Sequence, residues 1–200
     1  MIRLGITGGI GSGKTYVCHM LGLRGIPVYH CDDEAKRLMQ ESPVIKEQLC
    51  RLIGNEAYTN GTLNKPCIAQ FLFADKHHAD QVNSIVHPTV KQDFIQWTER
   101  QEAPIVAQEC ALLFEADFTD TVDVTVLVDA PKEIRLQRAM KRDHATADQI
   151  EARMAQQMDE EEKRRRADYT IINDGFSDLS GQIDLILEQI KDQTAKLPNN

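Results

Sequence analysis

The sequence predicts an α/β fold of three layers, in which a parallel sheet of about five strands carries helices on both faces. Five short, largely buried apolar segments are the first observation: Ile2–Thr7, Pro27–Cys31, Ile105–Gln108, Val122–Val128 and Tyr169–Ile172. The second is that helical patterns separate them, and this alternation implies right-handed crossovers and a parallel sheet. The third is a glycine-rich segment that directly follows the first strand, between a strand pattern and a helix pattern.

That segment, Gly8-Gly-Ile-Gly-Ser-Gly-Lys-Thr15, matches the phosphate-binding pattern G-x-x-x-x-G-K-[ST]. Glycines let the backbone curl so that successive N–H groups point inward and form a nest for anions. Lys14 adds a mobile cation for the β- and γ-phosphates, and the Thr15 hydroxyl is placed to bind Mg²⁺. The helix that begins near Lys14 directs its positive end at the same phosphates. The expected nucleotide-binding segment comprises Gly9, Ile10, Gly11, Ser12, Gly13, Lys14, Thr15 and Tyr16.

Two other interpretations of the loop are a plain glycine-rich turn and a dinucleotide-binding loop. Asp32 lies about where a Rossmann fold keeps its ribose-binding acid. However, G-x-G-x-x-G begun at Gly9 needs a glycine at position 14, where the chain has Lys14. The sequence therefore favours the mononucleotide loop.

The length, charge and cysteine content of the chain limit the classes of protein to which it can belong. The chain has 200 residues, which suits one α/β domain with an insertion, and a net charge of −8, which argues against a nucleic-acid-coating surface. Its five cysteines form no C-x-x-C pair, which favours reduced thiols and the cytoplasm. The N-terminus enters a strand at once, leaving no room for a signal peptide, and no apolar run approaches a membrane span.

Residues 36–100 interrupt the strand–helix alternation. We expect helices at Pro43–Ile53, Pro66–Phe73, Ala79–Val86 and Thr89–Arg100, and no strand. This segment is interpreted as a helical insertion at the carboxyl edge of the sheet, where ligands bind in open α/β folds.

The C-terminal third predicts three further helices. One opens at Asp129-Ala-Pro131 and continues through Arg142. A second starts at a capping box made by Thr146 and Gln149 and runs into Asp159–Arg166. Because Glu160, Glu161 and Glu162 each precede an arginine by four residues, that stretch is expected to face solvent. The last helix spans about Leu179–Lys191.

Asp32 is the candidate catalytic base, because it falls just past the second strand and should face the crevice beside the loop. Phosphoryl transfer to a hydroxyl needs a group that accepts the proton and aims the oxygen, and a carboxylate does both. Asp33 competes for this role. The purely structural alternative makes Asp32 the N-cap of a helix starting at Glu34.

Arg138 and Arg142 lie four residues apart on a predicted helix and so share a face. Such a pair can place one guanidinium on a base and the other on phosphate oxygens, although a solvated basic helix would look the same. Arg153 is a further lid candidate. His87, expected between two helices of the insertion, could face the substrate or serve only the fold.

Taken together, these residues resemble the dephospho-coenzyme A kinase family, and the resemblance covers nearly the whole chain. The glycine-rich loop is identical to the family's loop at every position from Thr7 to Lys14. Further segments resemble the family's motifs: Val28–Lys36, Val82–Pro88, Ala111–Glu115, Arg138–Asp143 and Ala167–Gly175.

The resemblance implies a P-loop kinase that uses ATP and Mg²⁺ to phosphorylate the ribose 3′-hydroxyl of dephospho-CoA, the last step of coenzyme A synthesis. It places Asp32 on the family's catalytic aspartate, Arg142 on the transferring phosphate and Arg138 and Asn173 near the adenine. The implied acceptor-binding residues are Asp32, Lys36, Lys65 and His87, and the implied metal ligand is Thr15. We expect no nucleic-acid or membrane partner. The oligomeric state is left open, with a monomer favoured, and so is the question whether Glu109 or Asp33 adds a second ligand for Mg²⁺.

The expected organisation has three parts. Residues 1–35, 101–137 and 167–200 would form the nucleotide-binding core, residues 36–100 the helical acceptor domain, and residues 138–166 the lid.

Some positions depart from the family's pattern: His30 and Cys31 replace Asp and Ala, Lys36 and Lys65 replace arginines, and Ala111 replaces a proline. Tyr16 replaces a small hydroxyl residue, so that only its backbone N–H is expected to matter.

Two rival functions remain open. Another P-loop small-molecule kinase, for a nucleoside monophosphate or a sugar acid, would share the loop, base and lid. A GTPase-type switch needs N-K-x-D, but the nearest string, Asn64-Lys65-Pro66-Cys67, ends in cysteine. Asp178-Leu-Ser-Gly181 follows the last strand, too late for a switch.

Overall fold

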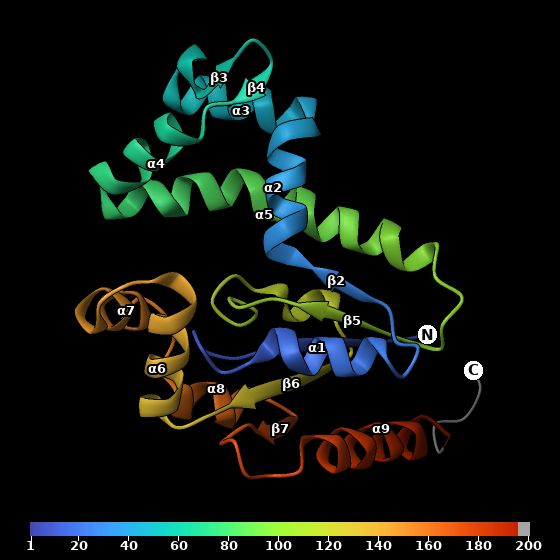
Figure 1. Ribbon diagram of the computed structural model, residues 1–200. Helices are drawn as coiled ribbons and strands as arrows, with labels where there is room; N and C mark the ends of the chain where they lie inside the picture. Colours follow the sequence, from blue (N-terminus) through green and yellow to red (C-terminus); the bar gives the residue numbers. More distant parts are fainter. Residues whose placement is uncertain (196–200) are drawn as a thin grey trace. The chain divides into compact units, whose positions relative to one another are not determined.

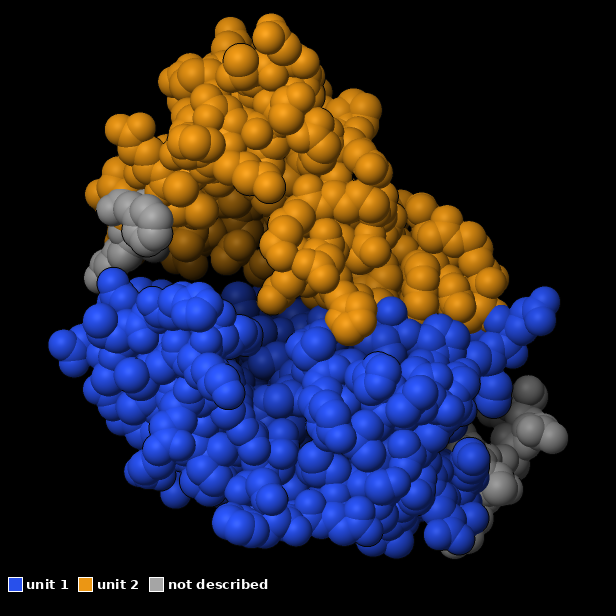
Figure 2. Space-filling model, in the orientation of Figure 1, with its two compact units in different colours: residues 1–28, 102–200 blue, residues 29–101 orange. Residues whose placement is uncertain are grey.

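The computed structural model describes residues 1–195, except the side chains of Phe73, Lys76 and residues 193–195. The chain forms two compact units, residues 1–28 with 102–200 and residues 29–101 (Figure 2). The division falls after Val28, within the second strand, whereas the sequence placed the start of the insertion at residue 36.

The sheet has five strands in the order β2-β5-β1-β6-β7 (Figure 1). Every recorded pairing among β5, β1, β6 and β7 is parallel, so the predicted α/β class is confirmed. The second strand is shorter than predicted, because Cys31 already begins a helix. The strands are β1 Ile2–Thr7, β2 Val28–His30, β5 Ile105–Glu109, β6 Val124–Asp129 and β7 Tyr169–Ile172.

Strand alternation divides the core of the first unit between the two faces of the sheet. Leu4 and Ile6 belong to the cluster that also buries the apolar residues of helices α1, Lys14–Gly22, and α9, Leu179–Ala195. Gly5 points to the opposite face, where Leu113 and Val122 pack so closely that a Cβ would meet their methyl groups.

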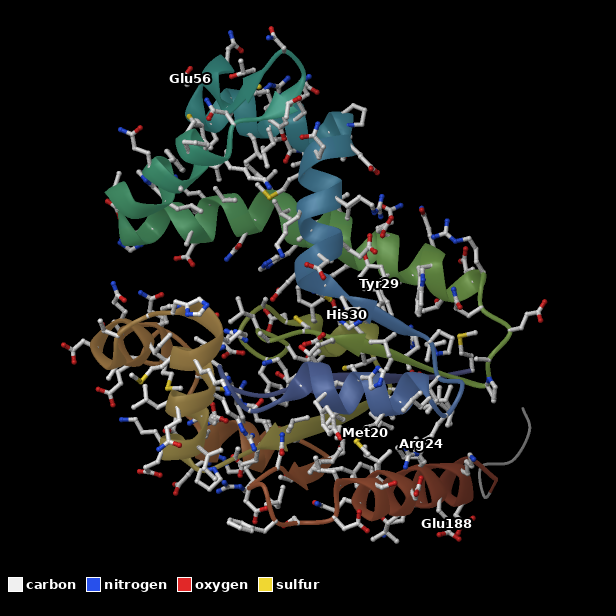
Figure 3. All side chains as sticks on the ribbon, in the orientation of Figure 1. Met20, Arg24, Tyr29, His30, Glu56 and Glu188 are labelled. Atoms are coloured by element: carbon white, nitrogen blue, oxygen red, sulfur yellow. The ribbon has the colours of Figure 1, made fainter. Side chains whose placement is uncertain are left out.

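Helix α1 is also tied to α9 at its C-terminal end. Arg24, just beyond α1, donates to the Asp184 carboxylate at 2.7 Å and to the Ser180 hydroxyl at 2.7 Å. Met20 and Arg24 both lie on the side of α1 that faces α9 (Figure 3). These contacts anchor the helix that carries Lys14 at its other end.

The capping box is confirmed, but the helix it starts is shorter than predicted. Thr146 accepts from the Gln149 N–H at 3.4 Å, and the Gln149 side chain accepts from the Thr146 N–H at 3.0 Å. The helix ends at Met154, and a separate helix begins after Asp159, whose side chain accepts N–H groups of the new first turn. The helices are α6 Lys132–Asp143, α7 Ala147–Met154 and α8 Glu160–Arg166, with a 3-10 turn η2 at Phe118–Thr121.

The prediction that the Glu160–Arg166 run faces solvent is wrong for part of it. Lys163 has no exposed surface, and Glu160 pairs with Arg135 instead of Arg164. Arg164 pairs with Asp129 at the end of β6. The expected pair of Glu162 with Arg166 does form, at 2.6 Å. Because α8 packs on β6, one of its faces turns inward despite its polar composition.

The second unit is mainly helical, as predicted, with one addition. A small antiparallel hairpin of β3, Tyr58–Thr59, and β4, Thr62–Leu63, interrupts it. Asn60 and Gly61 both have positive φ, 51° and 80°, as a tight hairpin turn requires. The other elements are α2 Cys31–Glu41, α3 Pro43–Ile53, the 3-10 turn η1 Asn55–Ala57, α4 Lys65–Ala74 and α5 Lys76–Glu99.

The prediction of two helices that meet near His87 is wrong, because α5 is one continuous helix. It continues through Pro88, although proline removes one hydrogen bond of the ladder. Buried side chains at four-residue spacing hold both halves in one line: Val82, Val86, Val90 and Phe94. Burial of this stripe offsets the local penalty of proline.

In the part of the chain that the structure describes, no helix is both long and apolar enough to span a bilayer. None of the five cysteines, all within the described residues, forms a disulfide.

Candidate functional site

The glycine-rich loop of the first unit links the end of β1 to the start of α1. Gly11 and Gly13 have φ of 79° and 95°, a left-handed backbone that other residues rarely adopt. Gly13 is also the N-cap of α1, so the first N–H groups of the helix face the loop's interior. The backbone has the curled form that the phosphate pattern predicts.

Lys14 and Thr15 occupy the first turn of α1. The Lys14 ammonium donates to the carbonyls of Gly8 at 2.8 Å and Gly9 at 3.4 Å, so it folds back over the loop. The Thr15 hydroxyl donates to the Glu109 carboxylate at 3.2 Å. Since Glu109 is the last residue of β5, these groups meet at the carboxyl edge of the parallel sheet. Tyr16 is 58% exposed.

Asn173 contacts the loop, and Arg138 contacts Asn173. The Asn173 side chain, 7% exposed, donates to the Ser12 carbonyl at 2.7 Å. The Arg138 guanidinium donates to the backbone carbonyl of Asn173 at 3.0 Å and to its side-chain oxygen at 3.4 Å. The structure thus places the predicted nucleotide-binding residue Asn173 on the loop and joins Arg138 to the loop through Asn173.

Arg142 does not join this group. Its side chain, 60% exposed, forms a two-pronged pair with Asp143 at 2.7 and 3.0 Å. Arg153 binds the same carboxylate at 2.6 Å. Hydrogen bonds from the two arginines hold the pKa of Asp143 well below its usual range.

The predicted acceptor residues belong to the second unit. Asp32 is exposed in the first turn of α2. Because that helix begins at Cys31 and its N-cap is His30, the alternative that Asp32 caps a helix starting at Glu34 is wrong. Asp33, the competing base, forms an ion pair with Lys36 at 2.7 Å.

Lys65 and His87 complete the predicted acceptor set. Lys65 is the exposed first residue of α4, whose N-cap Asn64 accepts the Cys67 N–H at 3.3 Å. This cap explains the Asn-Lys pair without a guanine-binding role. His87 is half-buried within α5.

The charge state of His87 makes stability depend on pH. Burial lowers the pKa of His87, and Lys91 lowers it further, while Asp32 opposes both. The unfolded chain therefore binds a proton at His87 that the folded chain does not, and folded stability is lost as pH falls below about 6.5 toward the lowered pKa. We expect the free energy of unfolding of wild type to fall more than that of His87→Gln between about pH 8 and pH 5.5.

Urea titrations of both proteins at the two pH values measure this difference, since all other ionisable groups are shared. Equal losses in the two proteins would contradict the assignment.

The oxygen atoms of Thr15 and Glu109 would suit a metal ion that keeps some of its water ligands. Among the described residues, no group of three His, Cys, Asp or Glu side chains could hold a metal. Mg²⁺ in nucleotide sites uses one or two protein oxygens together with phosphates and waters. The Thr15 hydroxyl and Glu109 carboxylate, 3.2 Å apart, meet that requirement.

Comparison with known proteins identifies the family. A model of the family described as dephospho-CoA kinase matches residues 2–178. A protein of that name from Bacteroides fragilis (strain YCH46) is 49% identical over 183 residues, covering 91% of this chain and 89% of the relative. The chain belongs to the dephospho-CoA kinase family. Another protein of that name, from Porphyromonas gingivalis, is 41% identical over 200 residues and covers 100% of this chain and 98% of the relative.

A solved structure supports the family fold. A crystal structure from Thermus thermophilus superposes with a TM-score of 0.82 at 35% identity, over 94% of this chain and 97% of the other. The family resemblance and the P-loop kinase fold predicted from the sequence are both confirmed.

Sequence reasoning missed several residues of this family member that contact the loop. Gln157 accepts the Ile10 N–H at 2.9 Å, and a Cβ on Gly9 would collide with the side chains of Arg135 and Glu160. Position 9 is unspecified in the phosphate pattern, so the pattern does not explain this glycine. No periodicity singles out Arg135 or Glu160, because both stand in helices that look solvated.

Proposed function

We propose that the protein transfers the γ-phosphoryl group of ATP to the ribose 3′-hydroxyl of dephospho-CoA, giving coenzyme A and ADP. The observation that carries this proposal is the match of residues 2–178 to the dephospho-CoA kinase family. The geometry of the loop supports it, because the curled backbone, the first turn of α1 and Lys14 present positive charge at one place.

The loop would act by stabilising charge. In the loose transition state of phosphoryl transfer, negative charge is spread over the oxygens of the moving group. Lys14 would exchange the carbonyls of Gly8 and Gly9 for phosphate oxygens, while the backbone N–H groups hold the β-phosphate. The Thr15 hydroxyl and Glu109 would hold Mg²⁺, which neutralises phosphate charge when bound.

Asp32 would orient the acceptor hydroxyl and take its proton. Its exposed position in the first turn of α2 leaves the carboxylate accessible to a substrate. Lys36, Lys65 and His87 come from the same helical unit and would bind the acceptor. Lys36 would then leave Asp33 for a phosphate of the substrate.

Residues 138–166 would form the lid. Arg142 would exchange its exposed pair with Asp143 for the transferring phosphoryl group. Arg138 and Asn173, already joined to each other, would lie beside the adenine. Closure of such a lid excludes water and limits hydrolysis of ATP.

We further infer a monomer that works in the cytoplasm. One chain supplies the loop, the proposed base and the lid arginines, and none of its five described cysteines forms a disulfide.

A panel of acceptors tests the proposed function. With ATP and Mg²⁺, we expect kcat/KM for dephospho-CoA to exceed that for nucleoside monophosphates and sugar acids by roughly a thousandfold or more. Product formation is followed by ADP release and by the mass of the phosphorylated acceptor. A higher kcat/KM with a nucleoside monophosphate or a sugar acid would replace the proposed substrate by that class.

A further inference from the structure

Four charged side chains lie together beside the glycine-rich loop, and we name them the buried charge cluster: Glu115, Arg135, Glu160 and Lys163. Arg135 binds Glu160 at 3.1 Å, and the Lys163 ammonium lies 3.3 Å from Glu115 and 3.8 Å from Glu160. Arg135 is 7% exposed and Lys163 is 0% exposed. The members come from α6, α8 and the segment after β5 (Figure 1).

The cluster is not a simple source of stability. Among the described side chains, six buried nitrogen or oxygen atoms lack a hydrogen-bond partner, and each cluster member contributes one of them. The other two are Thr7 Oγ1 and Ser12 Oγ, at the end of β1 and in the loop. Buried charges with incomplete hydrogen bonding are costly, and apolar replacements of the same volume are often no less stable. Packing alone therefore does not explain a fully buried lysine.

The cluster packs against the loop at Gly9 and Gly11. Arg135 and Glu160 fill the space that a side chain at Gly9 would need, and the backbone of Arg135 lies where a Cβ of Gly11 would stand. Glu115 also accepts the N–H of Met158 at 2.9 Å, and the neighbouring Gln157 accepts the Ile10 N–H at 2.9 Å. Thus the segment that holds Gln157 against the loop is itself held by the cluster.

We propose that the buried charge cluster positions residues 9–11 of the loop for phosphoryl transfer, and that Lys163 is its central positioning residue. This proposal rests on the proposed kinase function. Lys163 has no exposed surface, so it acts through Glu115, Glu160 and the loop and not by contact with the nucleotide. The ammonium joins the carboxylate that holds Met158 to the carboxylate that packs on Gly9.

Two variants separate positioning from stability. Lys163→Met removes the ammonium and leaves the carboxylates without it, so its melting temperature should fall. Glu115→Gln with Lys163→Met removes one charge of each sign and leaves the Arg135–Glu160 pair balanced, so most of the melting temperature should return. Lys132→Met is the matched control, because Lys132 lies on the helix of Arg135, outside the proposed lid, in an exposed pair with Glu151 at 2.8 Å.

The readouts are the melting temperature, kcat and KM for ATP, measured with the best acceptor of the panel. We expect both cluster variants to lose about tenfold to a hundredfold in kcat, because small misplacements of reacting groups have effects of this size. KM for ATP should change by less than about threefold, since most of the loop is intact. Lys132→Met should match wild type in all three.

Recovery of kcat together with the melting temperature in the double variant would overturn the proposal and leave the cluster a structural role only. A kcat of wild-type size in Lys163→Met would do the same. If wild type prefers another acceptor, the proposed substrate fails, while the ratio of kcat between wild type and variants with that acceptor still tests the cluster.

Discussion

Replacement of Lys14 by alanine is expected to lower kcat/KM for phosphoryl transfer by roughly a hundredfold to a thousandfold. The ammonium would be the mobile positive charge of the loop, and water cannot replace a preorganised cation in a closed site. The ammonium donates to two loop carbonyls and is not part of the buried apolar cluster of α1, so its removal leaves that cluster untouched. The melting temperature should therefore stay within a few degrees of that of wild type.

Steady-state kinetics and thermal unfolding of Lys14→Ala measure both effects. Lys141→Ala is the control, because Lys141 is an exposed lysine near the end of α6. Normal transfer by Lys14→Ala would remove the loop from the mechanism. A collapse of its melting temperature would instead show that Lys14 serves the fold.

Replacement of Asp32 by asparagine is expected to lower kcat by about a hundredfold to ten-thousandfold, the range typical of a lost general base. Asparagine keeps the size and the polarity of the side chain but cannot accept the proton of the acceptor hydroxyl at neutral pH. Asp32 is exposed in a helix whose N-cap is His30, so stability should be unchanged.

The neighbouring carboxylate supplies the matched control for this experiment. Asp33 is also exposed, lies in the same turn and pairs with Lys36. Asp33→Asn should keep kcat close to wild type, with at most a rise in KM for the acceptor if Lys36 is released. Turnover near wild type in Asp32→Asn, measured at saturating substrates, means that the assigned role is wrong, and a large loss in Asp33→Asn would move the role to that residue.

Local patterns were sufficient for much of the fold. Ile2–Thr7 is a strand and Lys14 begins a helix because apolar alternation, glycines and a helix start lie within a few residues of one another. The capping box of Thr146 with Gln149 is likewise a contact between residues three apart. Such features need no knowledge of the rest of the chain.

Two features depended on contacts that local patterns do not contain. Helix α5 continues through Pro88 because a buried stripe on both sides holds it. The predicted helix from Thr146 to Arg166 is two helices, because Asp159 caps a new first turn and Met158 binds Glu115 from another segment. The hairpin at Asn60–Gly61, by contrast, is signalled by neighbouring residues, and it lies between two predicted helices in a segment where no strand was expected.

The sequence by itself determined the parallel α/β architecture, the phosphate-binding loop and the family, because each is written in short runs of neighbouring residues. Only the tertiary structure decided that Lys163 and Arg135 are buried, that Gly9 must lack a side chain, and that Glu109 meets Thr15. Charged residues ordinarily lie at the surface, and only the packing of α8 against β6 takes this lysine out of water. That reversal depends on residues far apart in the chain, such as Arg164 and Asp129, which are 35 positions apart, and no pattern of neighbours reports it.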